Sequence, residues 1–361
     1  MASQTAVEWY GKKCFSSWSI AFPNGITIIP SESQSESRRI TERQVFYLPF
    51  LFIAICRVCL NSPVYLLFNP FNCDTVSQYA PAMITRCYLE ITNICNLDCC
   101  FCPKTAREKR TLSPDEFDKL TERLRGKVKF LYFHLMGEPL LHAHLPAFIA
   151  MAREKGFIPV ITTNGTLVSR AQAVIDAKPH KVQISLHSQE GNGLNNFEQY
   201  IGDVMRFAME AASNGVYIVL RLWNRGGLDR ENERLLSMIS AYIPQPWTMC
   251  QDGWRIADHI YIEFGRKFDW PDSDKEENGE EESFCYALRN QIGVLVDGTV
   301  VPCCLDSAGT IALGNLFEQS LDDVLANPRA RAIYDGFTRH KAVEPLCRRC
   351  GYASLIKRML K

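Results

Sequence analysis

The sequence predicts an α/β fold with a parallel sheet, and three observations point to it. Between residues 84 and 266, six strand-like segments alternate with helical segments across short connections, which is typical of parallel βαβ units. The composition, 47% hydrophobic and 22% charged residues, indicates a folded protein with a sizeable core. The length of 361 residues predicts two or three units. Six strand–helix units are fewer than the eight of a closed barrel, so an open barrel and a doubly wound sheet both fit.

Local patterns predict each element of this alternation. Strands are expected at Cys87–Thr92, Val128–Leu135, Ile158–Thr162, Lys181–Leu186, Val216–Trp223 and His259–Phe264. Helices are expected after Ser113 and over Leu145–Lys155, Leu167–Ala177, Phe197–Ser213 and Arg230–Tyr242. The first helix has the clearest start, because Ser113 can cap it, Pro114 fits its first turn and Glu116 completes a capping box.

The alternation stops at Asp269–Glu282, which contains eight acidic residues and is expected to be a solvated boundary loop. Beyond it, the pair Asp297-Gly298 predicts a hairpin turn. The elements expected there are Ile292–Val296 and Thr299–Pro302 in the hairpin, then helices over Ser320–Asn327 and Arg329–Phe337. The chain is therefore divided into an N-terminal extension (1–82), a core (83–266), an acidic linker (267–284) and a cysteine-rich unit (285–361).

The extension of residues 1–82 shows no regular pattern. Its apolar stretch Val45–Phe71 is interrupted by three prolines and by Arg57, and the uncharged piece before Arg57 has 12 residues. A spanning helix needs roughly 20 apolar residues, so no membrane span is predicted. A packed or interfacial segment and a poorly ordered leader both remain open.

Charge and cysteine usage restrict the partners and the compartment. Lys and Arg number 40, as do Asp and Glu, so no basic field predicts a nucleic-acid partner. The first residues lack the features of a signal peptide. Fifteen cysteines in such a chain predict reduced thiols in the cytoplasm, many of them metal ligands, rather than a disulfide framework.

Three of these cysteines follow the first predicted strand, in the loop where ligands bind in α/β folds. Cys95, Cys99 and Cys102 have the spacing C-x3-C-x2-C. Three thiolates on so short a loop can hold three irons of a cubane cluster and leave the fourth iron open. The alternative is a zinc knuckle with a distant fourth ligand. Cys100 breaks the spacing and is expected to be a small packed residue.

The run ITNICNLDCCFCPK, with the aromatic Phe101 before the last cysteine, resembles the cluster loop of radical S-adenosylmethionine (SAM) enzymes. The resemblance covers about residues 84–266 and implies a partial (β/α)6 TIM-type barrel. It implies that Cys95, Cys99 and Cys102 hold a [4Fe-4S] cluster whose open iron chelates SAM. One electron would cleave SAM to a 5′-deoxyadenosyl radical, which abstracts hydrogen from a substrate.

Further positions resemble the cofactor contacts of that family. Gly137, Glu138 and Pro139 resemble its GGEP loop, whose carbonyls receive the SAM amino group, although Met136 replaces the first glycine. Residues at the ends of later strands are cofactor-binding candidates, each with a structural alternative: Asn164 (a plain turn), Ser185 (a strand hydroxyl) and Arg221 (an ion pair). His187 could face the cavity, with a structural histidine as its alternative. Trp223 and Asn224 are candidates to line the substrate pocket.

A second cysteine set lies in the C-terminal unit. Cys285, Cys303, Cys347 and Cys350 resemble the ligands of the SPASM/twitch domains appended to radical SAM enzymes. Because no cysteine follows Cys350, the resemblance implies one auxiliary [4Fe-4S] cluster. Cys304 is an alternative to Cys303, and a structural zinc is an alternative to the cluster. The remaining cysteines are given no ligand role.

The sequence therefore predicts a radical SAM enzyme, and a two-electron oxidation of a small molecule is the leading reaction. The auxiliary cluster would accept the electron left on the substrate, and a flavodoxin or ferredoxin is expected as the electron donor. A peptide-modifying maturase is the first alternative, and a non-catalytic iron–sulfur protein is the second. The Gly137-Glu138-Pro139 loop argues against the non-catalytic protein.

Overall fold

The computed structural model describes residues 84–360, except 189, 194–195, 228, 275 and 277–281, together with two short strands near the N-terminus. These strands, β1 (Ile20–Ala21) and β2 (Thr27–Ile28), pair antiparallel. The chain divides into two compact units, residues 1–76 and 77–361. The apolar stretch Val45–Phe71 lies outside the described residues. No helix in the described part is both long and apolar enough to cross a membrane.

The second unit is built on one twisted sheet of eleven strands, in the order β13-β12-β11-β3-β4-β5-β6-β7-β10-β9-β8. The six predicted strands form its centre: β3 (Arg86–Leu89), β4 (Phe130–Tyr132), β5 (Ile158–Thr163), β6 (Lys181–Ser185), β7 (Tyr217–Arg225) and β10 (Ile260–Arg266). Each pairs in parallel with the next. The α/β class with a partial parallel barrel is therefore confirmed.

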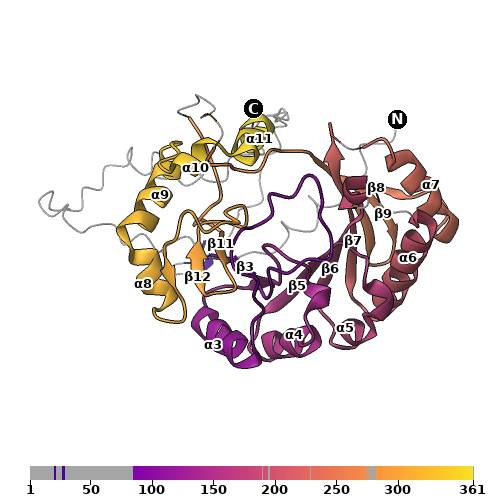
Figure 1. Cartoon of the computed structure of the whole chain (residues 1–361), viewed down its shortest axis with the longest axis horizontal. Helices are drawn as coiled ribbons and strands as arrows, with labels where there is room; N and C mark the ends of the chain where they lie inside the picture. Colours follow the sequence, from indigo (N-terminus) through magenta and orange to yellow (C-terminus); the bar gives the residue numbers. More distant parts are fainter. Residues whose placement is uncertain are drawn as a thin grey trace, which may run out of the picture. The chain divides into compact units, whose positions relative to one another are not determined.

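Helices cover the outer side of this sheet and leave loops in the middle of the ring (Figure 1). They are α3 (Pro114–Leu124), α4 (Leu145–Glu154), α5 (Gln172–Asp176), α6 (Phe197–Ser213) and α7 (Asn232–Tyr242). The capping box of α3 forms as predicted, since Ser113 accepts from the Glu116 amide and Glu116 accepts from the Ser113 amide. The predicted helix Leu167–Ala177 is shorter than expected, because a 3-10 turn, η2 (Val168–Arg170), precedes α5.

The two faces of the sheet differ in chemistry because successive side chains of a strand point to opposite sides. Apolar residues pack outward against the helices and are at most 2% exposed: Cys87, Leu89, Leu131, Phe133, Val182, Ile184, Leu220 and Leu222. Polar and aromatic residues occupy the inner face: Tyr88, Tyr132, His134, Thr162, Gln183, Ser185, Arg221, Trp223 and Glu263. A closed barrel is filled by branched apolar residues, so this inner face is built to line a cavity.

The C-terminal unit joins the same sheet, which the sequence did not predict. Its hairpin strands are β11 (Gln291–Val294) and β12 (Thr299–Val301), and β11 pairs in parallel with β3. This pairing covers the edge of β3, which would otherwise present unpaired backbone groups. Beyond the hairpin lie β13 (Gly314–Asn315), α8 (Leu321–Ala326), α9 (Pro328–Thr338), α10 (Pro345–Arg348) and α11 (Gly351–Leu360).

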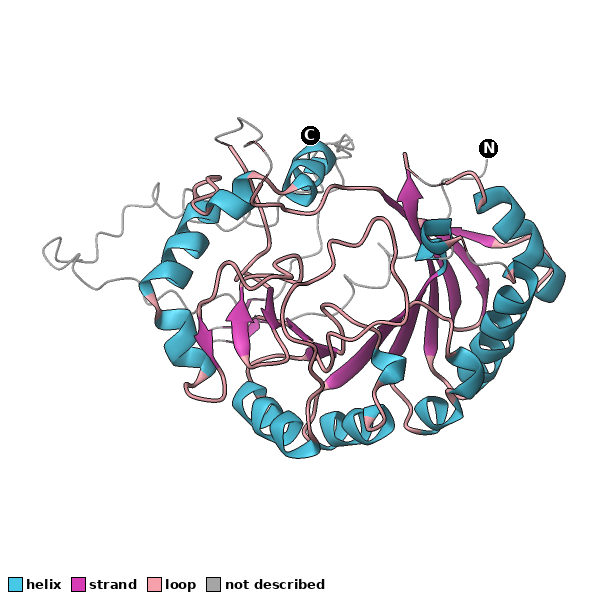
Figure 2. Cartoon of the chain, viewed as in Figure 1, coloured by secondary structure: helices cyan, strands magenta, loops and turns pink. Residues whose placement is uncertain are grey.

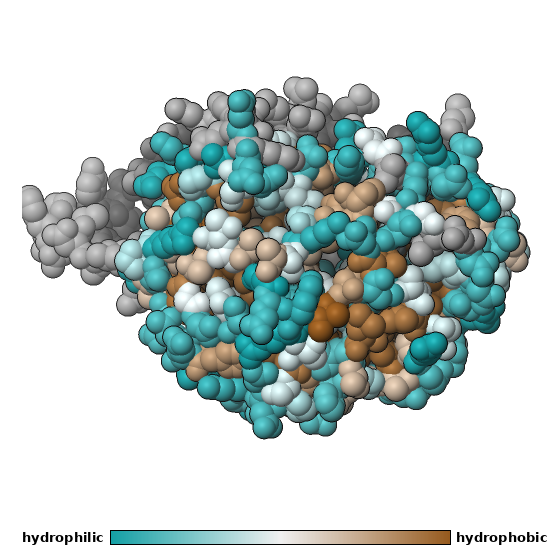
Figure 3. Space-filling model, viewed as in Figure 1, coloured by the Kyte–Doolittle hydropathy of each residue, from teal (hydrophilic) through white to brown (hydrophobic). Residues whose placement is uncertain are grey.

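The opposite edge carries a second hairpin that was not predicted, β8 (Thr248–Cys250) with β9 (Gly253–Ala257), and β9 pairs antiparallel with β10. Figure 2 shows the strands as a curved wall with helices outside it. In the space-filling view, the rim over the outer helices is largely hydrophilic, and apolar side chains show mainly further inside it (Figure 3).

Candidate active site between two cysteine sets

The loop after β3 carries the three cysteines of the predicted cluster motif. Cys95 is exposed, and Cys99 and Cys102 are half-buried. The segment after β6 holds this loop in place. There, Asn192 Nδ2 donates to Cys99 Sγ at 2.9 Å and Asn192 Oδ1 accepts from the Asp98 amide at 2.9 Å.

The surroundings of these three thiols favour their protonated form. Burial raises the pKa of Cys95, Cys99 and Cys102 above the ordinary value. The thiolate charges of Cys95 and Cys102 raise the pKa of Cys99 further, against the hydrogen bond from Asn192. Iron would offset both effects, since a coordinating thiol is deprotonated by its metal.

No group of three His, Cys, Asp or Glu among the described residues is arranged to hold a single metal ion. A mononuclear zinc site draws its thiolates around one point. In a cubane each thiolate binds its own iron, so the sulfurs stand further apart.

The loop after β4 packs directly under the cysteine loop. Gly137 has φ +78°, and a Cβ there would lie 2.3 Å from the Thr92 carbonyl oxygen, so only glycine fits. The Glu138 amide donates to the Ile94 carbonyl at 2.8 Å. Met136 is not among the residues with positive φ, so its replacement of glycine does not strain the loop.

The side chain of Glu138 points away from the cavity and forms hydrogen bonds that link this loop to the end of β5. Its buried carboxylate accepts from Thr163 Oγ1 at 2.7 Å, the Asn164 amide at 2.7 Å and the Leu140 amide at 3.0 Å. Burial raises the pKa of Glu138, and these three hydrogen bonds oppose the shift. The amide group of Asn164 is thereby directed at the cysteine loop, where its Nδ2 donates to Asn96 Oδ1 at 3.0 Å and lies 4.0 Å from Cys95 Sγ.

A cavity of about 1130 Å³ lies on the inner face of the sheet and is lined by two residues of the cysteine loop and by the second cysteine set. Cys100 and Phe101 line it from the cysteine loop, and Cys285, Cys303, Cys347 and Cys350 line it from the C-terminal unit. Cys100 is exposed here, which corrects the expectation of a packed residue. The backbone places Cys100 on the open side of the loop.

Three predicted contacts from later strands also line this cavity: Ser185, His187 and Arg221. Ser185 and Arg221 are register partners on β6 and β7. His187 lies beside Phe101, with ring centroids 5.2 Å apart, and its Nδ1 is 3.1 Å from the Arg221 carbonyl oxygen. Burial lowers the pKa of His187 to about 4, so its ring is neutral at pH 7.

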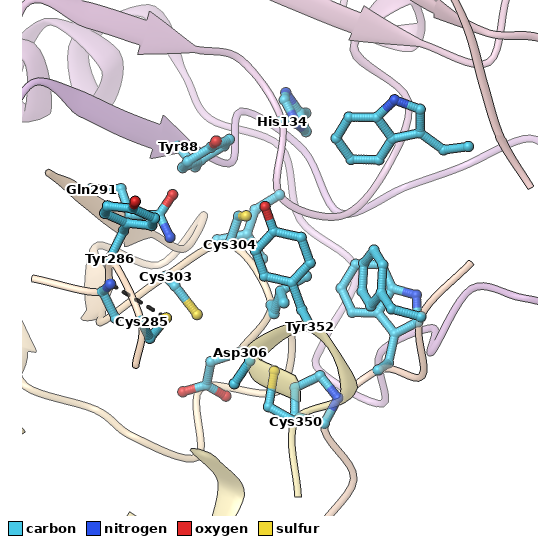
Figure 4. Close-up of a pocket in the computed structure, with 18 of the residues that line it drawn as sticks. Tyr88, His134, Cys285, Tyr286, Gln291, Cys303, Cys304, Asp306, Cys350 and Tyr352 are labelled. Atoms are coloured by element: carbon cyan, nitrogen blue, oxygen red, sulfur yellow. Dashed lines mark hydrogen bonds between the residues drawn. The ribbon is translucent and has the colours of Figure 1, made fainter. Parts of the chain in front are cut away.

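The four predicted auxiliary cysteines meet at the other end of the cavity. Burial raises the pKa of Cys285 to about 11 and also raises the pKa of Cys303, Cys347 and Cys350. In Figure 4, the sulfurs of Cys285, Cys303 and Cys350 lie around a common space, whereas that of Cys304 lies toward Tyr88 and His134. This arrangement favours Cys303 over Cys304 as a ligand.

The sequence analysis missed several residues of the cavity wall: Tyr88, Tyr132, His134, Gln183 and Glu263. The signal was available, because each sits at an alternate position of a predicted strand whose intervening residues are apolar. Trp223 and Asn224 line the cavity as expected.

Comparison with known families matches two segments of the chain. Residues 89–239 match the radical SAM superfamily, and residues 285–351 match SPASM, an iron–sulfur cluster-binding domain. The S-adenosyl-L-methionine-dependent 2-deoxy-scyllo-inosamine dehydrogenase of Niallia circulans is 24% identical over 285 residues, 74% of this chain and 92% of that protein. The Fe-coproporphyrin III synthase of Methanosarcina barkeri is 32% identical over 131 residues, 35% of this chain and 32% of that protein.

Among solved structures, native anSMEcpe with bound AdoMet gives a TM-score of 0.50 at 14% identity, covering 74% of this chain and 89% of that one. BtrN in complex with AdoMet and 2-DOIA gives a TM-score of 0.47 at 19% identity, covering 75% and 94%. At this identity, the likeness to anSMEcpe shows a common fold.

Proposed function

Because this chain belongs to the radical SAM superfamily and carries a SPASM domain, we propose that it oxidises a small molecule by two electrons in the cavity between its two cysteine sets. The observation that carries this proposal is the cavity itself, which is lined at one end by the loop of Cys95, Cys99 and Cys102 and at the other by the auxiliary cysteines. The dehydrogenase of Niallia circulans, whose length the chain covers almost completely, supports an oxidation.

Cys95, Cys99 and Cys102 would hold the [4Fe-4S] cluster at which SAM binds. When bound, the cluster and SAM supply a 5′-deoxyadenosyl radical, which takes a hydrogen atom from the substrate. The carbonyls of Gly137, Glu138 and Pro139 would receive the SAM amino group.

The rest of the proposed cofactor site orients SAM and excludes water. Asn164 is fixed by Glu138 beside Cys95, and Phe101 and Ser185 form the adjoining cavity wall. These side chains would hold the cofactor between the cysteine loop and the inner face of β6.

Cys285, Cys303, Cys347 and Cys350 would hold the auxiliary [4Fe-4S] cluster. Four thiolates give every iron a protein ligand, so this cluster has no open position for substrate. Its proposed role is to take up the second electron of the oxidation. Both clusters require reduced thiols, which supports a reducing compartment such as the cytoplasm and an electron donor such as flavodoxin or ferredoxin.

The size of the cavity supports a small substrate over a peptide. Pockets for small ligands usually measure roughly 300–1,000 Å³. This cavity measures about 1130 Å³ and must also receive SAM and the cluster edges. The space left suits a single small molecule, so a peptide-modifying reaction is the less favoured alternative.

The test is an assay of anaerobically reconstituted protein. Two clusters predict about eight irons per chain, and reduction by dithionite in the presence of SAM should yield 5′-deoxyadenosine. Cys99→Ala should abolish this product, whereas Cys250→Ala should not, because Cys250 is exposed and lies outside the cavity wall. Zinc in place of iron at the first loop would overturn the proposal.

A further inference from the structure

Arg221 is a buried cation without a matched anionic partner. Only 9% of the residue is exposed, and its Nε has no hydrogen-bond partner. The guanidinium stacks on the Trp223 ring, 3.4 Å from the centroid. Glu263, the register partner of Arg221 on the next strand, accepts from the Trp223 indole at 2.8 Å, and its charge raises the pKa of Arg221 against the effect of burial. A buried charge is costly unless it is paired and hydrogen-bonded, so the guanidinium would bind an anion in the cavity favourably.

A second unpartnered group lies close to Arg221. The Nδ1 atom of His134 is buried and has no hydrogen-bond partner. Its ring makes edge contacts with Tyr88 and Tyr132, at centroid distances of 5.4 Å and 5.9 Å. Burial and the positive charge of Arg221 lower the pKa of His134 to about 3. The ring is therefore neutral at pH 7 and can offer one N–H group.

These two groups line the cavity together with Tyr88 and Cys304. His134, Tyr88 and the sulfur of Cys304 lie on one side of the space in Figure 4. An anion in this part of the cavity would meet both Arg221 and His134, and the predicted contact of Arg221 with the SAM carboxylate is the alternative that the experiment distinguishes.

We infer that Arg221 and His134 bind an oxyanion of the substrate, a carboxylate or a phosphate, at the auxiliary end of the cavity. The inference rests on the proposed function, since it names the class of substrate that the same cavity takes. A guanidinium can donate two parallel hydrogen bonds to such a group, and the His134 N–H can donate a third. Stacking on the Trp223 ring holds the guanidinium group of Arg221 in place.

This anchor would also set the direction of the substrate. With the oxyanion held by Arg221 and His134, the rest of a small molecule would extend toward Phe101, beside which SAM is proposed to bind. The carbon that loses hydrogen would then lie between the cofactor and the auxiliary cluster.

The experiment is equilibrium dialysis of reconstituted, SAM-loaded enzyme with radiolabelled malonate and, separately, inorganic phosphate. Arg221→Gln should weaken binding of the preferred anion by at least about tenfold, the loss expected for a charged hydrogen bond. Arg225→Gln is the matched control, because Arg225 also stacks on an aromatic ring, Phe264, but is exposed and outside the cavity wall. The preferred probe distinguishes a carboxylate from a phosphate substrate.

Unchanged anion binding in Arg221→Gln would overturn the inference. So would a fall in SAM affinity with anion binding retained, because it would return Arg221 to the cofactor site. His134→Phe keeps the ring and should also weaken anion binding, so the test survives if Arg221→Gln does not fold. Cleavage of SAM by the wild-type enzyme tests the proposed function separately.

Discussion

Arg107 and Glu90 form a buried ion pair in which Nη2 of the arginine lies 2.7 Å from Oε2 of the glutamate. Glu90 also accepts from the amides of Met136 and Val296, at 3.2 Å and 3.3 Å. Arg107 Nε donates to the Ser307 carbonyl at 3.0 Å. One ion pair therefore ties the cysteine loop to the Met136-Gly137 loop and to the C-terminal unit, which fixes both ends of the cavity relative to each other.

Arg107→Met should destabilise the protein, because it leaves the fully buried Glu90 without its cation. Removing one partner of a buried pair costs about 3–5 kcal/mol. The thermal unfolding midpoints of reconstituted variant and wild type, compared with each other, measure this loss of stability. Arg110→Met is the control, since its pair with Glu116 is more exposed and should cost less than about 1 kcal/mol.

The same variant has a pH signature. Burial raises the pKa of Glu90, and Arg107 opposes the shift, so the pKa should rise further in Arg107→Met. Glu90 of the folded variant then stays protonated at pH values at which the unfolded chain has released this proton. The free energy of unfolding of the variant therefore falls as the pH rises. The loss in free energy of unfolding relative to wild type should be larger at pH 8 than at pH 6. An equal difference at both values would show that Glu90 does not carry the effect.

Asn192→Ala should lower the reduction potential of the cluster proposed at Cys99. The Asn192 amide donates to Cys99 Sγ, and hydrogen bonds to the sulfurs are among the factors that set cluster potentials. An EPR-monitored redox titration measures the change. Asn96→Ala removes an amide in the same loop that bonds Thr166 and Asn164, so it should leave the potential nearly unchanged. Equal shifts in both variants would contradict a specific role for Asn192.

Gly137→Ala should reduce both stability and SAM affinity. A Cβ at this position would strike the Thr92 carbonyl at 2.3 Å, which forces the loop away from the cysteines. Gly156→Ala is the control, because Gly156 also has positive φ, +88°, but has open space around it. The control should lose only about 1 kcal/mol and keep its SAM affinity. Thermal unfolding and equilibrium dialysis with SAM compare the two.

The sequence predicted the parts of the fold that depend on local patterns. The six central strands, the Ser113 cap and the whole of α6 agree with the structure. The β8–β9 hairpin was missed although Asp252-Gly253 is a turn-forming pair. The pairing of β11 with β3 was not predictable, because no local pattern says which sheet edge a hairpin will cover.

In the candidate site too, only the residues that are close in sequence could be predicted. The cysteine loop is contiguous in sequence, so its spacing could be read directly. The partners of Glu90 and the neighbours of Arg221 come from distant strands, and only the folded sheet brings them together. The polar inner face could have been predicted from alternation, because Tyr132 and His134 are spaced by two within an otherwise apolar strand.

Cys347→Ala should separate the roles of the two clusters. If Cys285, Cys303, Cys347 and Cys350 hold an auxiliary cluster that accepts the second electron, the variant should still cleave SAM at the first cluster but should fail to form oxidised product. Its iron content should fall from about eight to about four per chain. Cys250→Ala controls for the loss of a thiol, since that residue is exposed on β8.

The measurement counts 5′-deoxyadenosine and oxidised product separately, with the fold of the variant checked by circular dichroism. Wild type should give the two in a constant ratio, and Cys347→Ala should give 5′-deoxyadenosine alone. Because the auxiliary cysteines line the same cavity as Phe101 and Ser185, a substrate radical formed there lies within reach of their cluster. If the variant forms product at the wild-type ratio, the electron leaves by another route. The auxiliary cluster then stabilises the C-terminal unit, and the oxidation must be assigned to a different acceptor.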